Sequence, residues 1–296
     1  MKSKYRCHNS LWVATLLMLS LVPLNMGGCA SGGGGLAGIG NAVGGAVGGT
    51  TGNLIKAGGT AGEALSLNEA HEPALGQSVA VSVTSRHPPT SDLALNKYVG
   101  LVGLTVASVT AQPDANWVFG VLESDDVNAF SGPSGYVMIT RGALRQMQDE
   151  SELAGVLAHE IAHVVHKHGL EAVRSAGIKK AGVQAATAGE DAAQFTSVAD
   201  GLTDVALKGF GQKEENVADQ TAVIYLIRAG YDPEGYARFL DRMGQAQKSA
   251  GPRFLSSHPG AANRASNVRA KANEKGAPGG ATLAERFRKY VPKPAA

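Results

Sequence analysis

The stretch that decides the fold is HEIAHVVHKH, residues 159–168, which holds four of the eight histidines in the chain. His159 and His163 are four residues apart, so on an α-helix their side chains project about 40° apart around the axis and about 6 Å along it. Two imidazoles placed in this way can meet one tetrahedral metal ion. His166 and His168 have no required role in this arrangement, and we leave them off the metal.

The residues around these histidines predict a helix from Ser151 to His168. Asp149, followed three residues later by Glu152, matches a capping box and marks the start of the helix. Apolar residues then recur at helical spacing, at Leu153, Val156, Leu157, Ile161 and Val164. The histidines therefore belong to an amphipathic helix.

Glu160 follows the first histidine directly and completes the pattern HExxH. In this pattern the carboxylate lies beside the metal, where it can take a proton from metal-bound water. Zinc lowers the pKa of its water to roughly 7, and the resulting hydroxide attacks a peptide carbonyl that the same ion polarises. We therefore predict one Zn²⁺ per chain, with His159 and His163 as ligands and Glu160 as general base. The alternative is an exposed helix surface with ordinary side-chain pairing.

A catalytic zinc site needs a third protein ligand. One common pattern would require glycine at 166 and histidine at 169, whereas the chain has His166 and Gly169, so this option fails. The other common source is a glutamate from a later helix. The stretch EENVADQ, residues 214–220, offers Glu215, which shares a helix face with Asp219 four residues later.

Three separated motifs together resemble a known family. HEIAHVVHKH, then ENVAD, then SSHPGAANR at 256–264 is similar to the gluzincin metalloendopeptidases of the HtpX, BepA and CAAX prenyl protease kind, in matching order from about Ser91 to Val268. The resemblance implies an α+β, mainly helical, zincin-like metallopeptidase domain. Its small β-sheet would pack beside the HExxH helix.

The resemblance also implies roles for residues outside the HExxH helix. Glu215 matches the third zinc ligand, with Glu214 as its competitor, and Asp219 matches the carboxylate that orients a ligating histidine. His258 and Arg264 match a pair near the active centre that steadies the tetrahedral oxyanion or touches the metal in a resting state. The alternatives are a loop histidine for His258 and a structural salt-bridge partner for Arg264.

The segment Asn128, Ala129, Phe130 and Ser131 resembles the edge strand along which these enzymes hold an extended substrate by main-chain hydrogen bonds. Binding of this kind depends on backbone shape more than on side chains, so it suits unfolded or misassembled polypeptides. The alternative is a plain hairpin connection.

Weaker patterns place the other elements. Two runs rich in β-branched and aromatic residues, Trp117–Leu122 and Gly135–Thr140, predict strands of a small sheet. Other helices are expected around 98–106 and at 142–148, 214–229 and 234–243. The alanine-rich region 170–207 has low complexity and no readable position. One short helix is expected near Phe287.

The first 28 residues predict a secretory signal, because a basic start precedes an apolar stretch from Leu11 to Val22 that is too short to span a bilayer. The stretch MGGCAS, residues 26–31, resembles a bacterial lipobox, so Cys29 is the expected lipidation site. Ala30 after this cysteine suggests the outer membrane, with the protein facing the periplasm. The alternative is an ordinary signal peptide with an incidental cysteine.

Four regions are expected in the chain: a signal peptide at 1–28, a glycine-rich tether or glycine zipper at 29–63, a zinc metallopeptidase domain at 64–270 and a flexible basic tail at 271–296. Residues 31–62 contain 14 glycines and one charged residue, Lys56, so they cannot form a core of their own. Glycines at 40, 44, 48 and 52 would let another helix approach closely. A flexible spacer is the simpler alternative.

The formal net charge of the chain is +2, and loss of the first 28 residues removes Lys2, Lys4 and Arg6. A chain near neutrality argues against binding to nucleic acid. We expect a zinc-dependent endopeptidase that hydrolyses unfolded or misassembled envelope proteins and reaches the membrane through Cys29. One alternative is a chaperone-like periplasmic binding lipoprotein with structural zinc and little turnover. Another makes the glycine-rich segment a membrane-inserting module that the peptidase regulates.

Overall fold

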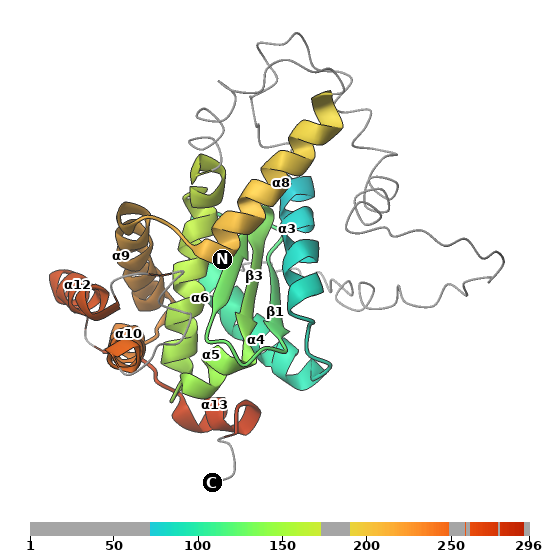
Figure 1. The fold of residues 1–296 in the computed structure, drawn as a ribbon. Coiled ribbons are helices and arrows are strands. Elements are labelled where there is room, and N and C mark those ends of the chain that lie inside the picture. Colours follow the sequence, from blue (N-terminus) through green and yellow to red (C-terminus); the bar gives the residue numbers. More distant parts are fainter. Residues whose placement is uncertain (1–71, 173–189, 249–257, 259–260, 278, 293–296) are drawn as a thin grey trace, which may run out of the picture. The chain divides into compact units, whose positions relative to one another are not determined.

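The structure is a computed structural model, and it describes residues 72–172, 190–248, 258, 261–277 and 279–292 (Figure 1). The predicted signal peptide, Cys29 and the glycine-rich segment lie outside the described residues. Within the described ranges, no helix combines the length and the hydropathy needed to cross a membrane.

The described residues form α-helices and a three-stranded sheet, as the predicted α+β, mainly helical class requires. The helices are α3 (Glu72–Arg86), α4 (Leu93–Ala107), α5 (Arg141–Gln146), α6 (Glu150–Val165), α8 (Glu190–Lys208), α9 (Gln212–Ala229), α10 (Pro233–Lys248), α12 (Ala261–Glu274) and α13 (Ala284–Tyr290). The strands are β1 (Val118–Leu122), β2 (Ala129–Gly132) and β3 (Tyr136–Thr140). The two strands predicted from β-branched runs correspond to β1 and β3.

The sheet has the order β1-β3-β2, so β2 is an edge strand. β1 runs parallel to β3, and β2 pairs antiparallel with β3 through the short connection between them. Ser134 and Gly135 in that connection both have positive φ, 63° and 93°. Glycine suits the second position because a Cβ there would lie only 3.0 Å from the carbonyl oxygen of Asn116.

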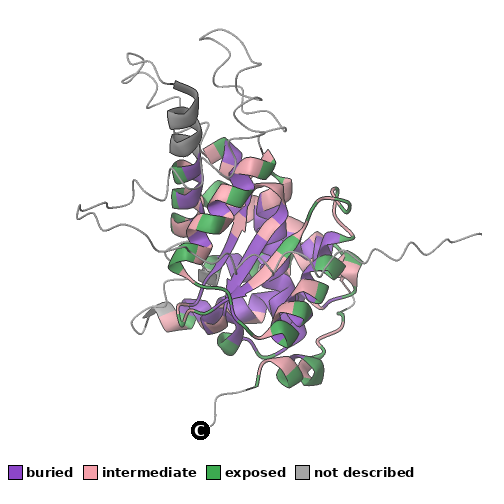
Figure 2. Cartoon of the chain, turned by 90° about the vertical axis from the view of Figure 1, so that its right-hand side faces the viewer, coloured by how far each residue is buried: buried purple, intermediate pink, exposed green. Residues whose placement is uncertain are grey.

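Both faces of the sheet are buried, and alternate residues serve two separate apolar clusters (Figure 2). Val137 and Ile139 of β3 belong to the larger cluster, which includes α4, α6, α9 and α10. Met138 between them belongs to the smaller cluster, with α3 and α8. The period of two along a strand explains this division. Helix α6 packs on the sheet next to β2.

Helix α6 begins where the capping pattern predicts. Asp149 is the N-cap, and its Oδ1 accepts a hydrogen bond from the backbone N–H of Glu152 at 3.1 Å. The Glu152 carboxylate accepts from the N–H of Gln148 at 2.9 Å, one residue earlier than a reciprocal capping box requires. The helix ends at Val165, before the predicted end at His168, because Lys167 adopts φ +55° and breaks the helical path.

The C-terminal residues differ from the flexible tail predicted from 271 onward. Residues 271–274 complete α12, and α13 follows at the place where one short helix was expected. Phe287 of α13 is only 1% exposed, and Tyr290 stacks on Tyr98 with ring centroids 4.4 Å apart. Arg286 also bonds to the buried carboxylate of Glu150. These contacts hold the segment against α4 and α6 despite its polar composition.

Candidate metal centre

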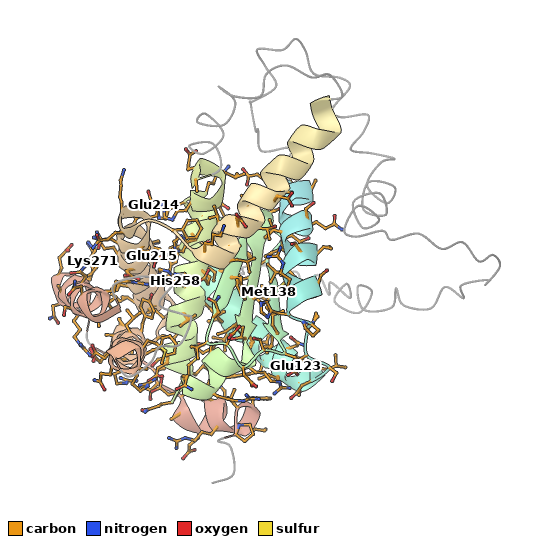
Figure 3. The ribbon with its side chains drawn as sticks, in the orientation of Figure 1. Glu123, Met138, Glu214, Glu215, His258 and Lys271 are labelled. Atoms are coloured by element: carbon orange, nitrogen blue, oxygen red, sulfur yellow. The ribbon has the colours of Figure 1, made fainter. Side chains whose placement is uncertain are left out.

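The predicted site residues come from three helices and one loop position, and they meet beside α6. His159, Glu160 and His163 lie on α6, Glu215 and Asp219 on α9, Arg264 on α12, and His258 just before α12. Each is at most 5% exposed. Helix α9 packs on both α6 and α12, so residues about 100 positions apart in sequence share one interior (Figure 3).

Four side chains can each direct one donor atom to a common point. These donors, which all lie within 4.8 Å of one another, belong to His159, His163, Glu215 and His258. The Nε2 atoms of His159 and His163 are 3.0 Å apart, and each lies 3.4 Å from an oxygen of Glu215. His258 Nδ1 lies 3.0 Å from Glu215 Oε1 and 3.4 Å from His159 Nε2.

These spacings fit a tetrahedral zinc ion. Zinc bonds of 2.0–2.1 Å in tetrahedral geometry place neighbouring donor atoms about 3.3 Å apart. Imidazole nitrogens and a carboxylate oxygen are the donor types that zinc accepts in catalytic sites. The residues therefore fit the predicted Zn²⁺, with His258 in the place of a fourth ligand.

Glu160 lies beside this donor set without belonging to it. Its Oε1 is buried and accepts no hydrogen bond from the residues that the structure describes. His258 Nε2 lies 3.6 Å from this oxygen. A buried carboxylate oxygen without a hydrogen bond is costly unless a ligand, water or ion completes its surroundings.

Asp219 and Arg264 contact two members of the donor set, His159 and Glu215. Asp219 Oδ1 lies 3.0 Å from Nδ1 of His159, the ring nitrogen opposite the donor atom. Arg264 donates to both oxygens of Asp219 at 2.8 and 2.7 Å, and its Nη1 lies 2.6 Å from Glu215 Oε2. The guanidinium thus binds the two carboxylates that face the histidines.

Burial and neighbouring charges shift the pKa values of the donor side chains in different directions. Burial would raise the pKa of Glu215, but His258 and His159 outweigh it and hold that pKa far below its usual range. Burial also lowers the pKa of His163, aided by His159, so its ring stays neutral. For His159, burial and Arg264 act to lower the pKa, but Glu215 and Asp219 raise it to about 9. A zinc ion bound at Nε2 of His159 would take the place of a proton on that nitrogen.

Glu215 and its sequence neighbour Glu214 have different surroundings in the structure. Glu215 is 1% exposed and faces the histidines, whereas Glu214 is half-buried and outside the donor set. Figure 3 places Glu215 close to His258, with Glu214 nearer the outer end of α9. The choice of Glu215 over Glu214 as the candidate ligand agrees with this geometry.

Tyr236 is a part of the site that sequence reasoning missed. Its hydroxyl donates to Asp219 Oδ1 at 2.8 Å and accepts from Arg264 at 2.7 Å. Gly155 of α6 makes this approach possible, because a Cβ there would lie 2.4 Å from the Cβ of Tyr236. The only signal in the sequence is that a tyrosine on an apolar helix face needs a partner for its hydroxyl.

His168 and Phe210 were also missed, and both contact His163. The Nδ1 atoms of His168 and His163 lie 2.9 Å apart. The ring of Phe210 stacks on His163 with centroids 4.0 Å apart and planes 14° apart. His166 instead lies 2.9 Å from the hydroxyl of Thr221. Neither His166 nor His168 joins the donor set in the described structure, in line with leaving both off the metal.

The predicted substrate segment lies next to His163. Asn128 precedes β2, and Ala129, Phe130 and Ser131 are in it. One pocket is lined by residues of this strand and by one of the four donor residues; its lining includes Ser131, Gly132, His163, Leu202, Val205 and Phe210. Strand β2 and the candidate ligand His163 thus border one hollow.

Comparisons with known proteins agree on one family. Residues 94–272 match the model of peptidase family M48. The chain is similar to the beta-barrel assembly-enhancing protease of Escherichia coli, with 30% identity over 229 residues, 73% of this chain and 46% of that protein. It is 25% identical to the metalloprotease LoiP of Escherichia coli over 225 residues, 73% of this chain and 86% of that one.

A mitochondrial relative gives a similar match. The metalloendopeptidase OMA1 of Schizosaccharomyces pombe is 31% identical over 183 residues, which cover 61% of this chain and 52% of that protein. The chain spans about half the length of the beta-barrel assembly-enhancing proteases that it matches.

Proposed function

The chain belongs to peptidase family M48, and on this basis we propose that it is a zinc-dependent endopeptidase for unfolded or misassembled proteins of the bacterial cell envelope. Family membership confirms the predicted class of zinc metallopeptidase and its cofactor. The observation that carries the proposal is the spacing of the four donor atoms on His159, His163, Glu215 and His258. Four buried donor atoms at this spacing match the coordination of one zinc ion.

The protein side chains divide the work. When bound, the zinc ion would lower the pKa of a water molecule and polarise the substrate carbonyl. Glu160 is the general base, because its buried Oε1 is free of hydrogen bonds from the described residues and can receive a proton. His159, His163 and Glu215 would hold the ion. Asp219 fixes the ring of His159 through Nδ1, and a partner of this kind keeps a ligand oriented.

Arg264 serves as a positioning residue in this account. Its side chain is 6% exposed and binds Asp219 and Glu215, so it keeps two negative charges close together beside the ligands. Without it, the two buried carboxylates would repel each other in a region of low dielectric constant. The role of steadying an oxyanion, implied by resemblance, would require a different orientation of this side chain.

His258 keeps the site in a closed state. A catalytic zinc site has three protein ligands and leaves the fourth position for water or substrate. Here His258 Nδ1 would take that fourth position when zinc is bound, because it lies 3.0 Å from Glu215 Oε1 and 3.4 Å from His159 Nε2. We therefore propose that His258 withdraws before a substrate carbonyl enters. Its Nε2 already lies 3.6 Å from Glu160 Oε1, so this histidine covers the general base as well.

The register of β2 indicates how an extended substrate would bind. Thr140 N–H donates to Asn128 C=O at 3.0 Å, so residues 128, 130 and 132 exchange hydrogen bonds with β3. Ala129 and Ser131 then direct their main-chain groups to the free edge. The N–H of Ala129 already donates to the side chain of Asn128. A substrate strand would therefore pair mainly with the N–H and C=O of Ser131.

The cellular assignment rests on the N-terminal sequence and on the relatives. Cys29 in its lipobox-like setting supports anchoring to the outer membrane with the domain in the periplasm. One relative is named for enhancing β-barrel assembly, which supports misassembled envelope proteins as substrates.

A Cys29→Ser variant should leave the membrane fraction for the soluble periplasmic one. Unchanged membrane association would contradict the lipid anchor.

Replacing Glu160 by glutamine tests the activity itself. Loss of the general base should lower the cleavage rate of denatured casein by roughly 10²–10⁴-fold, while bound zinc per chain stays the same. Glu214→Gln is the matched control, because Glu214 is a neighbouring carboxylate outside the donor set, and its activity should be close to wild type. Equal casein cleavage by Glu160→Gln and wild type would favour the alternative, a chaperone-like binder with structural zinc.

A further inference from the structure

His168 is a buried histidine that the predicted mechanism does not use. We propose that it is a positioning residue: its Nδ1 accepts a hydrogen bond from His163 and thereby fixes the tautomer and the ring orientation of that zinc ligand. The inference rests on the proposed zinc site. It assigns His168 a task that the HExxH pattern alone does not define.

The direction of the hydrogen bond follows from the two nitrogens of His163. Its Nε2 faces the donor set, 3.0 Å from His159 Nε2 and 3.4 Å from Glu215 Oε1, so a bound ion must meet a lone pair there. A neutral imidazole has a single N–H, which must then be at Nδ1. That Nδ1 lies 2.9 Å from Nδ1 of His168, which accepts the bond. The opposite tautomer of His163 would place a proton where the ion binds.

The ring of His163 is held in two directions. Phe210 stacks on one face of the ring, with centroids 4.0 Å apart, and limits tilting. His168 meets it edge-on, with planes 72° apart, and limits rotation within the ring plane. His159 is held differently, since its outer nitrogen faces the carboxylate of Asp219. One ligand therefore has a charged partner and the other a neutral one.

The turn of the backbone after α6 brings the ring of His168 back to that of His163. On an uninterrupted helix, residues five apart point about 140° away from each other, so these rings would not meet. The helix instead ends at Val165, and Lys167 takes φ +55°, a conformation that costs free energy for a residue other than glycine. Lys167 is held by an ion pair with Glu72 of α3 at 2.7 Å.

The test compares side chains that differ in their ability to accept a hydrogen bond. Zinc affinity would be measured by competition with a chromophoric chelator for wild type, His168→Leu and His168→Gln. Loss of a bond to a ligating histidine weakens metal binding 10–100-fold, so His168→Leu should show a decrease of this size. His168→Gln has an acceptor oxygen and should recover most of the affinity. His166→Leu, which alters the neighbouring histidine, should match wild type.

A second readout follows the proton directly. In the zinc-bound wild type, ¹⁵N NMR of the histidine rings should show His163 protonated at Nδ1, and His168→Leu should show altered His163 ring resonances. Thermal unfolding of the metal-free proteins serves to check that each variant folds. Equal zinc affinity of His168→Leu and wild type would overturn the positioning role alone. Equal losses in folded His168→Leu and His168→Gln would also overturn it, while a wild type that binds no zinc would remove the metal site itself.

Discussion

The Nε2 atoms of His159 and His163 lie 3.0 Å apart, on successive turns of α6. Each ring has its other nitrogen bound by a different partner, Asp219 Oδ1 at 3.0 Å and His168 Nδ1 at 2.9 Å. The two rings are therefore oriented by the protein, and an ion need not reorganise them on binding. Preorganised ligands lower the entropic cost of metal binding.

Substitution of His258 by alanine should open the fourth position. Because the Nδ1 of His258 completes the donor set, its removal should weaken zinc binding but admit water and substrate. We expect cleavage of denatured casein, measured at saturating zinc, to rise several-fold over wild type. A fall in activity at full zinc occupancy would instead support the role of steadying the oxyanion.

The free edge of β2 can be tested by removing one main-chain donor. Ser131→Pro eliminates an N–H that points away from β3, so the β2–β3 ladder should survive. Loss of one substrate hydrogen bond, worth about 1 kcal/mol, should lower kcat/KM for an extended peptide roughly 5–10-fold. Ser131→Ala keeps the N–H and should leave kcat/KM near wild type. With thermal unfolding unchanged, an unaltered kcat/KM for Ser131→Pro would contradict strand pairing at this edge.

Glu150 at the start of α6 makes stability depend on pH. Its buried carboxylate accepts hydrogen bonds from Tyr98, Tyr231 and Arg286 at 2.9, 2.7 and 2.6 Å. Burial would raise the pKa of Glu150, but the bonds from Arg286 and the two tyrosines outweigh it and hold that pKa below its usual value. The ionised form of Glu150 therefore stabilises the folded protein relative to the unfolded chain.

The sign of this effect is set by the lowered pKa in the folded state. The stabilisation is present above the unfolded-state pKa of about 4.3 and is lost as pH falls through the folded-state value. Glu150→Gln should lower the free energy of unfolding at pH 7 by about 1–3 kcal/mol, and the difference from wild type should shrink toward pH 3. Urea unfolding of both proteins across this range is the measurement. A difference that stays constant with pH would contradict the account.

Much of the site could be predicted because its signals are local. The HExxH spacing places two imidazoles on one helix face, and the Asp149 cap marks where α6 begins. Glu215 and Asp219 share a face of α9 for the same reason. The four-residue period is a property of any helix, so these pairings do not depend on the rest of the fold.

The features that escaped prediction depend on contacts distant in sequence. The early end of α6 follows from the backbone at Lys167, whose partner Glu72 is 95 residues away. Tyr236 joins the site only because Gly155 leaves space on another helix. Phe287 packs into the core from a segment whose composition is polar. Tertiary packing overrode local composition in each case.

The most direct test of the central claim is the amount of zinc bound per chain in wild type and in Glu215→Ala, together with cleavage of denatured casein. Glu214→Ala is the control, because it removes the adjacent carboxylate and leaves the donor set intact. We expect one zinc per chain and full cleavage for wild type and Glu214→Ala, with zinc and cleavage both lost in Glu215→Ala. Undiminished zinc and cleavage in Glu215→Ala would show that α9 does not supply a ligand and would contradict the account.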